Sequence, residues 1–307
     1  MLRPRWIDVY LTEGVKKTFD QTFLKVWPPA GPPEAKIAAL SLIPILLIST
    51  ALFFYSCTPK KNGGAVLHTP FEIIDELGNK REYRVFLPPA AGDKALPLLV
   101  YFHGVWSEEF KEKIPALKNY TASPVEETGL IGLSRDKKFA LLVPEAYYEL
   151  KALKNCTAKG WKMDEEIDGI EKIIDKIVSE YNISKQEIYL AGISAGAVLC
   201  HYLANKRPDY YAALLSHSQA YTDKEGKGKV RRPALKGPQF GVLFAYTKGD
   251  YANLIEYCKE SYQIYKESGY RVELLKDLPP LSHTWAAQSN EKFWSLLQKL
   301  KRVGRDL

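Results

Sequence analysis

The sequence predicts an α/β domain, with a mostly parallel eight-stranded sheet flanked by helices, preceded by one transmembrane helix. From Phe71 onward, short β-branched or aromatic runs alternate with longer helical stretches, as in a sheet covered by helices on both faces. The length of 307 residues, 46% of them hydrophobic, allows a large buried core. Before this region, residues 37–57 carry no charge, and about 20 apolar residues suffice to span a bilayer.

Each predicted strand is a short aliphatic or aromatic run between turn-forming residues. The strands are expected at 71–77, 82–88, 96–103, 139–145, 187–192, 211–218, 240–246 and 270–276. Each predicted helix is a longer segment in which apolar residues recur every three or four positions. The helices are expected at 163–181, 195–206, 252–269 and 284–300. Together these elements place residues 71–307 in a single domain.

The uncharged segment 37–57 organises the N-terminal part of the chain. We expect residues 1–36 to form a cytoplasmic tail, 37–57 the transmembrane helix, and 58–70 a polar tether. A buried core helix is one alternative, although globular helices rarely lack a polar face for so long. A cleaved secretory signal is another, although 36 residues precede the run. The residues before Cys57 faintly resemble a lipoprotein cleavage box, so lipidation of Cys57 is a third.

Charge on the flanks of this segment gives its orientation. Four lysines precede the span and two follow it, which favours a cytoplasmic N-terminus and an extracytoplasmic domain. Three sequons, at Asn119, Asn155 and Asn182, fit the lumenal domain of a eukaryotic protein. Part of the net charge of +7 lies in the basic C-terminal tail, which is either a solvated helix end or a contact with anionic lipid. The membrane is the expected partner, and no nucleic acid is expected.

The cysteines argue against a disulfide scaffold and against a metal site. They lie at positions 57, 156, 200 and 258, without a CxxC motif or a Cys/His cluster. A disulfide bond between two of the last three cysteines is an alternative if the domain lies outside the cytoplasm. We therefore expect no metal and no cofactor.

A nucleophile is predicted at Ser194. The strand at 187–192 leads into Gly192-Ile-Ser194-Ala-Gly196 and then into a helix, so a Gly-x-Ser-x-Gly motif stands in the strand–turn–helix context that it requires. The glycines allow a strained turn that raises the serine hydroxyl above the sheet. The alternatives are a glycine turn that only packs the helix on the strand and a phosphate loop, which the absence of a following lysine disfavours.

A serine hydroxyl needs a base, and in this arrangement the acid and the base follow the nucleophile along the chain. His283 precedes the last helix and is the predicted base, with His217 as its rival. Asp250 follows the strand at 240–246, at the carboxyl edge where ligands gather, and is the predicted acid. Asp277 is the alternative acid.

Two backbone N–H groups are expected to stabilise the oxyanion that forms when the serine attacks an acyl carbon. One belongs to Ala195, which follows the nucleophile. The other is assigned to Val105, in the turn His103-Gly104-Val105-Trp106 after the strand at 96–103. Read only as structure, His103 ends a strand and anchors this turn by side-chain hydrogen bonds.

These residues and their surroundings resemble a known family. The stretches EYRVFLP, LLVYFHG, YNISKQEIYLAGISAGA and the terminal SHTW are similar to α/β-hydrolase esterases related to polyhydroxybutyrate depolymerases and feruloyl esterases. The resemblance covers most of residues 80–300. It implies an α/β-hydrolase fold with Ser194 as nucleophile, Asp250 as acid and His283 as base, and with Trp285 beside the substrate pocket, where an aromatic residue can equally be core.

The sequence also departs from the family pattern. Ala197 stands in place of a glycine after the nucleophile, Leu281-Ser282 replace glycines before the histidine, and Val105-Trp106 replace small residues. These changes alter the lining of the pocket, where Trp106 is expected to contact the substrate.

The combined interpretation is a membrane-anchored serine hydrolase that cleaves small-molecule or polymeric carboxylic esters. Two alternatives remain: a noncatalytic binding module with this fold, and a thioesterase or peptidase that uses the same three residues.

Overall fold

The computed structural model describes residues 66–67, 71–75, 78–89, 94–105, 123–151, 157–222, 230–233 and 240–301. All of them belong to one compact unit. The predicted tail, the span at 37–57 and most of the tether lie outside the described residues. Within the described part, no helix combines the length and apolarity needed to cross a membrane.

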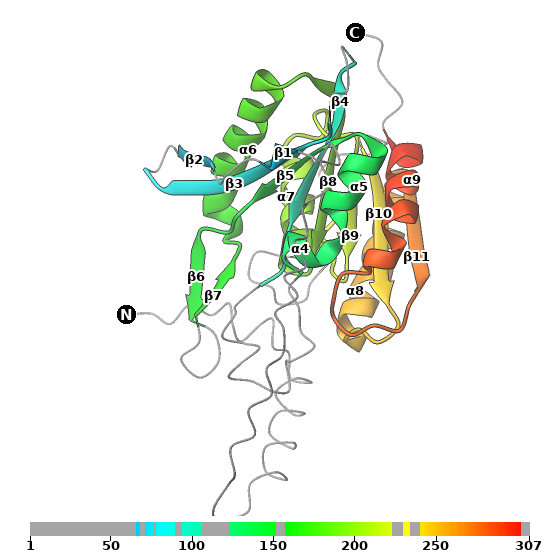
Figure 1. Ribbon diagram of the computed structural model, residues 1–307. Helices are drawn as coiled ribbons and strands as arrows, with labels where there is room; N and C mark the ends of the chain where they lie inside the picture. The colour runs from blue at the N-terminus through cyan, green and yellow to red at the C-terminus, as the bar shows by residue number, and fades with distance from the viewer. Residues whose placement is uncertain are drawn as a thin grey trace, which may run out of the picture. The chain divides into compact units, whose positions relative to one another are not determined.

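The described part is built on one large sheet with strand order β1-β3-β5-β4-β8-β9-β10-β11, with β2 paired to β3 (Figure 1). All eight predicted strands are present, and β1 is an additional one. The strands are β1 Val66–Leu67, β2 Phe71–Ile74, β3 Lys80–Leu87, β4 Leu96–Phe102, β5 Ala140–Pro144, β8 Ile183–Ile193, β9 Ala213–His217, β10 Gly241–Thr247 and β11 Val272–Leu278.

Most neighbouring strands of the sheet are parallel, as expected, but the sheet is mixed and has nine strands where eight were expected. From β5 to β11 every neighbouring pair is parallel, whereas β3 pairs antiparallel with β1, β2 and β5. The short connection between β2 and β3 accounts for their pairing, because only antiparallel neighbours can be joined by a tight turn. β1 lies within residues 58–70, so the end of the predicted tether belongs to the sheet.

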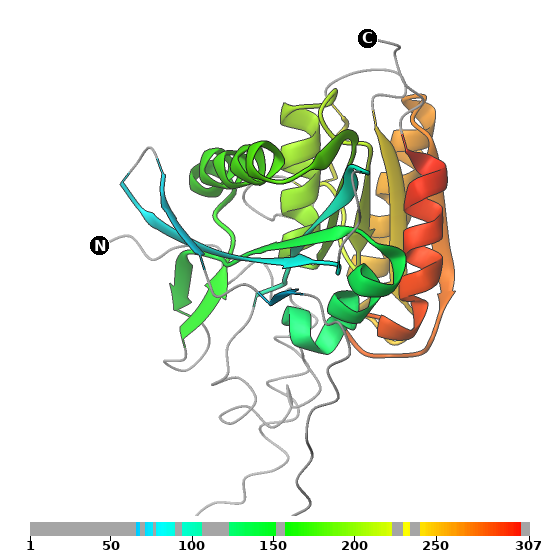
Figure 2. The ribbon, with the colours of Figure 1, turned by 45° about the horizontal axis from the view of Figure 1, so that its top comes forward.

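Helices cover both faces of the sheet, as predicted. On β4, Leu98, Val100 and Phe102 face one core cluster, and Leu99 and Tyr101 face the other, because successive side chains point to opposite faces. The first cluster includes residues of α6 Met163–Glu180, α7 Ala195–Lys206 and α8 Ala252–Glu267, and the second includes residues of α4 Val125–Thr128, α5 Leu130–Lys137 and α9 Asn290–Leu300. In Figure 2 the sheet separates α6, above, from α4 and α5, below.

Some elements differ from the sequence-based expectations. α4 and α5 and the hairpin of β6 Tyr148–Lys151 and β7 Thr157–Gly160 were not predicted. The last helix begins at Asn290 rather than 284, after the 3-10 turn η3 Ala287–Ser289. β11 extends to Leu278, so Asp277 lies within a strand and is exposed.

Candidate active site

Ser194 occupies a strained turn between β8 and α7. Its φ of 55° and ψ of −123° lie in a region that non-glycine residues rarely adopt. The Ser194 N–H donates a 3.0 Å hydrogen bond to the His217 carbonyl oxygen at the end of β9. The Ser194 side chain is therefore fixed at the carboxyl edge of the parallel strands, as expected from the motif.

The two glycines of the motif are required by close backbone contacts. A Cβ on Gly192 would lie 2.4 Å from the carbonyl oxygen of Gly196, and a Cβ on Gly196 would lie 2.2 Å from that of Phe102. Such distances are far below van der Waals contact. Any side chain at either position would push the strand, the turn and the helix apart.

The close contact of Gly196 with the end of β4 bears on the two predicted oxyanion donors. Ala195 is the first residue of α7, so its N–H has no acceptor within the helix. Val105 follows the carbonyl groups of Phe102 and His103 against which Gly196 packs. The structure thus places the start of α7 beside the turn that carries Val105.

His103 anchors this turn through its side chain, as the sequence suggested. Its Nδ1 lies 2.5 Å from the Gly104 carbonyl oxygen, and its Nε2 accepts a 3.3 Å hydrogen bond from the Ala146 N–H. Burial lowers the pKa of His103, so the imidazole is neutral, with its proton on Nδ1. The Trp161 indole N–H donates to the His103 carbonyl oxygen at 2.7 Å and holds the same turn from the side of α6.

Asp250 and His283 form a hydrogen bond of 2.8 Å between Oδ1 and Nδ1. Both side chains are buried, with 0% of the Asp250 side chain and 5% of the His283 side chain exposed. A Cβ on Gly249 would lie 2.5 Å from the Leu281 carbonyl oxygen, so the two loops pack closely. Thr247 Oγ1 also donates to the Ser282 carbonyl oxygen at 3.2 Å. These loop contacts hold the acid and the imidazole together.

The Asp250 carboxyl is kept ionised by its partners. Burial alone would raise its pKa, but hydrogen bonds and charge interaction with His283, and further donors, lower the pKa below its usual value. The Tyr251 N–H donates to Oδ1 at 2.8 Å, and the Tyr251 ring lies 5.5 Å from the His283 ring. A negative charge is therefore held beside the histidine.

The structure distinguishes the alternative residues by position. Asp277 is exposed within β11, whereas Asp250 is the carboxylate bonded to His283. His217 is fully buried, stacks on Trp285 at 5.3 Å, and has its pKa lowered to about 3 by burial. His201 is also fully buried; it contacts Tyr265 and Ser216 and its pKa is lowered to about 3.

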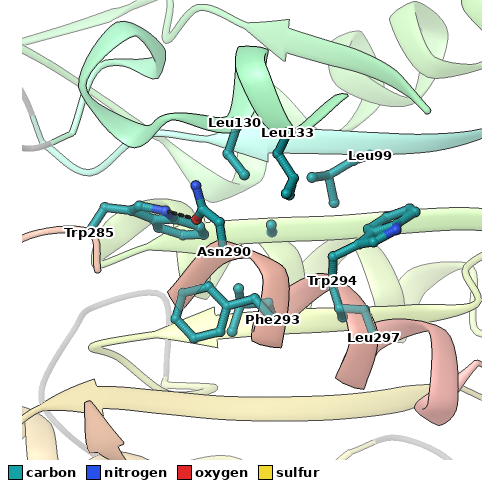
Figure 3. A pocket seen from close by; sticks show the side chains of 10 residues that line it. Leu99, Leu130, Leu133, Trp285, Asn290, Phe293, Trp294 and Leu297 are labelled. Carbon is teal, nitrogen blue, oxygen red and sulfur yellow. Dashed lines mark hydrogen bonds between the residues drawn. The ribbon is translucent and has the colours of Figure 1, made fainter. Parts of the chain in front are cut away.

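Trp285 lies in the core between the sheet and α9. Only 4% of it is exposed, its indole N–H donates to Asn290 Oδ1 at 2.8 Å, and its backbone N–H donates to Ser123 Oγ at 2.9 Å. Figure 3 shows it beside a small apolar cavity lined also by Leu99, Leu133 and Phe293. The structure therefore places Trp285 among core residues, while Trp106 lies outside the described residues.

Comparison with known proteins identifies the family. The model of the Esterase family, described as "Putative esterase", matches residues 74–294. The chain belongs to this esterase family. The prediction of a carboxylic ester hydrolase with an α/β-hydrolase fold is confirmed at the level of the family. No curated protein matches the esterase sequence.

Solved structures similar to this esterase share its fold. A ferulic acid esterase has 15% identity and a TM-score of 0.52, with 78% of this chain and 99% of that chain covered. An S-formylglutathione hydrolase from Agrobacterium tumefaciens has 13% identity and a TM-score of 0.52, with 77% and 99% covered. A thermostable esterase has 16% identity and a TM-score of 0.50, with 76% of this chain covered, and this chain spans only 63% of its length.

Sequence reasoning missed several residues around the site of this esterase. Gly249 and Thr247 hold the loop that carries Asp250 against the loop that carries His283. Tyr251 packs on His283, and the Ser218 side chain interacts with the Asp250 carboxyl. A signal for Tyr251 was present, because an aromatic residue directly follows the predicted acid. Cys200 and Cys258 are buried and free, so neither forms the disulfide that was left open.

Proposed function

We propose that the protein is a membrane-anchored serine hydrolase that cleaves carboxylic esters through an acyl-enzyme. The observation that carries this proposal is the hydrogen bond between Asp250 and His283, in loops that leave the same sheet edge as the Ser194 turn. Because Nδ1 of His283 bonds to the acid, Nε2 is the ring atom assigned to the nucleophile. The family and the depressed pKa of Asp250 support the same assignment.

In the proposed reaction, Ser194 Oγ attacks the ester carbonyl carbon while His283 Nε2 takes the hydroxyl proton. The N–H groups of Ala195 and Val105 donate hydrogen bonds to the oxyanion. The tetrahedral intermediate collapses, the C–O bond to the alcohol breaks, and Nε2 returns the proton to the leaving oxygen. Water then attacks the acyl-enzyme with proton transfer to Nε2, and the carboxylic acid leaves as Ser194 regains its proton.

Three further residues, all aromatic, have separate assignments. Trp106 is proposed to contact the substrate, because it follows Val105 directly in the chain. Trp285 acts on the substrate only through the residues that it packs against, since it is buried. Tyr251, which is 38% exposed beside His283, is proposed to contact the alcohol part of the ester.

The membrane anchor is proposed from residues 37–57, whose length and lack of charge fit a transmembrane helix. Only residues 58–65 separate this segment from β1, and their full extension is about 26 Å at about 3.3 Å per residue. The excess of lysines before the segment supports an extracytoplasmic domain. The enzyme would then act on lipids, wall components or external esters close to the membrane surface.

The enzymatic proposal is tested on membranes that contain the full-length chain. We expect a fluorophosphonate probe to label Ser194, and short-chain nitrophenyl esters to be hydrolysed. Ser194→Ala should lose both signals, whereas Ser268→Ala, at the end of α8, should keep both. Absence of labelling and of turnover in the unchanged chain would establish a noncatalytic module. Labelling without cleavage of oxygen esters, but with cleavage of thioesters or peptides, would change the substrate class.

The orientation is tested through the sequon at Asn182, which is exposed directly before β8. In a eukaryotic membrane we expect a glycosidase-sensitive mass that decreases in Asn182→Gln, and we expect the chain to resist extraction by alkaline carbonate. Digestion of residues 71–307 by a protease added to the cytoplasmic side would contradict this orientation.

A further inference from the structure

Two buried polar atoms, one on Asp250 and one on His217, lack hydrogen-bond partners among the described residues. Oδ1 of Asp250 accepts from His283 and from the Tyr251 N–H, but Oδ2 has no partner. Nε2 of the neighbouring His217 ring also has none. Such atoms are uncommon in folded proteins, because a polar atom that is buried without a hydrogen bond has lost its interaction with water and has no replacement for it.

Ser218 is adjacent to both of these side chains. It follows β9, is fully buried, and has a φ of 57°, an unusual conformation for a serine. Its N–H donates to the Ala245 carbonyl oxygen at 2.7 Å, which fixes its backbone beside β10. Its Oγ lies 2.8 Å from Nδ1 of His217, and the Ser218 side chain is also close enough to Asp250 to lower the pKa of that carboxyl.

The direction of the bond between Ser218 and His217 follows from the tautomer of the imidazole. Burial keeps His217 neutral, so one ring nitrogen carries a hydrogen. On Nε2 this hydrogen would be a buried donor without an acceptor, whereas on Nδ1 it is donated to Ser218 Oγ. The Ser218 hydroxyl hydrogen is then free to be donated elsewhere, and Asp250 Oδ2 is the acceptor nearby that lacks a partner.

We propose that Ser218 is a positioning residue that donates a hydrogen bond to Asp250 Oδ2, with His217 fixing the orientation of its hydroxyl. The carboxylate is then held at both oxygens, and Oδ1 stays directed at His283 when positive charge develops on the imidazole. Trp285 takes part indirectly, because its ring stacks on His217 at an angle of 26°. This inference rests on the proposed function.

The test compares Ser218→Ala with Ser216→Ala in the full-length chain. Ser216 is a fully buried serine of β9, two residues before Ser218, but its hydroxyl bonds to His201 and to the Gln219 carbonyl oxygen. Rates are divided by the number of sites that react with a fluorophosphonate, so unfolded chains do not count. We expect Ser218→Ala to lower kcat about tenfold to hundredfold, with KM within about twofold, because a hydrogen bond to a charged group is stronger than one between neutral groups. Ser216→Ala should keep kcat within about twofold.

A second pair of variants tests the role of His217. Both His217→Asn and His217→Leu lose the ring that stacks on Trp285, but the Asn side chain keeps an N–H near the place of Nδ1. We expect His217→Asn to keep at least about five times the kcat of His217→Leu. Equal kcat for this pair, or an unchanged kcat or a loss confined to KM in Ser218→Ala, would overturn the inference. An unchanged chain without labelling or turnover would instead overturn the proposed function, and this inference with it.

Discussion

The backbone N–H of Ser194 donates a 3.0 Å hydrogen bond to the carbonyl oxygen of His217. This bond holds the strained turn after β8 against the end of β9. The His217 side chain in turn contacts Ser218 Oγ and is close enough to Asp250 to interact with its charge. The position of the serine therefore depends on the neighbouring strand as well as on its own motif.

Alanine at the glycines of the turn is expected to disrupt the esterase. A Cβ on Gly196 would clash with the Phe102 carbonyl oxygen, so Gly196→Ala should destabilise the domain by at least about 1–3 kcal/mol and abolish fluorophosphonate labelling. Gly132→Ala, in α5, is the control, because a Cβ there meets nothing within 4 Å. It should be neutral or slightly stabilising. Thermal unfolding in detergent and labelling measure both effects, and equal behaviour of the two variants would contradict the prediction.

Replacing the acid should reduce turnover far more than it reduces stability. In Asp250→Asn the 2.8 Å contact with His283 loses its charge, and the histidine is no longer held in the tautomer with an unprotonated Nε2. We expect kcat to fall about 10⁴-fold while the chain stays folded. Asp277→Asn, at the exposed alternative in β11, should keep the activity of the unchanged chain. A larger loss in Asp277→Asn than in Asp250→Asn would reverse the assignment of the acid.

The buried position of Trp285 predicts a stability effect without a specificity effect. Trp285→Phe removes the indole N–H that donates to the buried Asn290 Oδ1. The loss of this hydrogen bond should lower the free energy of unfolding by about 1–3 kcal/mol. We expect kcat/KM to stay within about twofold across a panel of esters. In combination with Asn290→Ala the stability losses should be less than additive. A change in substrate preference without a change in Tm would show that Trp285 contacts the substrate.

A buried carboxylate predicts how stability depends on pH. Burial raises the pKa of Glu166 to about 7, although Arg81 Nη1 lies 2.8 Å from its Oε2. The folded state therefore holds the proton more tightly than the unfolded state, and this group destabilises the fold increasingly as pH rises from about 4.5 to about 7. Glu166→Gln should remove this dependence.

The measurement for Glu166 is the Tm of the two chains in detergent at about pH 5 and about pH 8. Relative to the unchanged chain, Glu166→Gln should be more stable at the higher pH than at the lower one. Glu165→Gln is the control, since Glu165 is a partly exposed neighbour on the same helix. The same pH dependence in all three chains would show that Glu166 does not titrate in this range.

Local sequence patterns predicted the parts of the fold that depend on local properties. The eight runs of apolar residues became strands, and the glycines around Ser194 predicted the sharp turn, because steric limits on the backbone act over a few residues. The antiparallel edge at β3 was missed, because pairing direction depends on how distant segments meet. α4 and α5 were missed because both are short, with four and eight residues.

Local residue patterns indicated the family, the turn that carries the nucleophile and the order of the candidate acid and base along the chain. The folded structure was needed to show that Asp250, and not Asp277, bonds to His283, and that Trp285 is buried. Those outcomes depend on contacts such as that between Gly249 and Leu281, which are distant in sequence. A residue pattern carries no information on which loops touch, because that is fixed by the register of the strands and by the packing of the whole core.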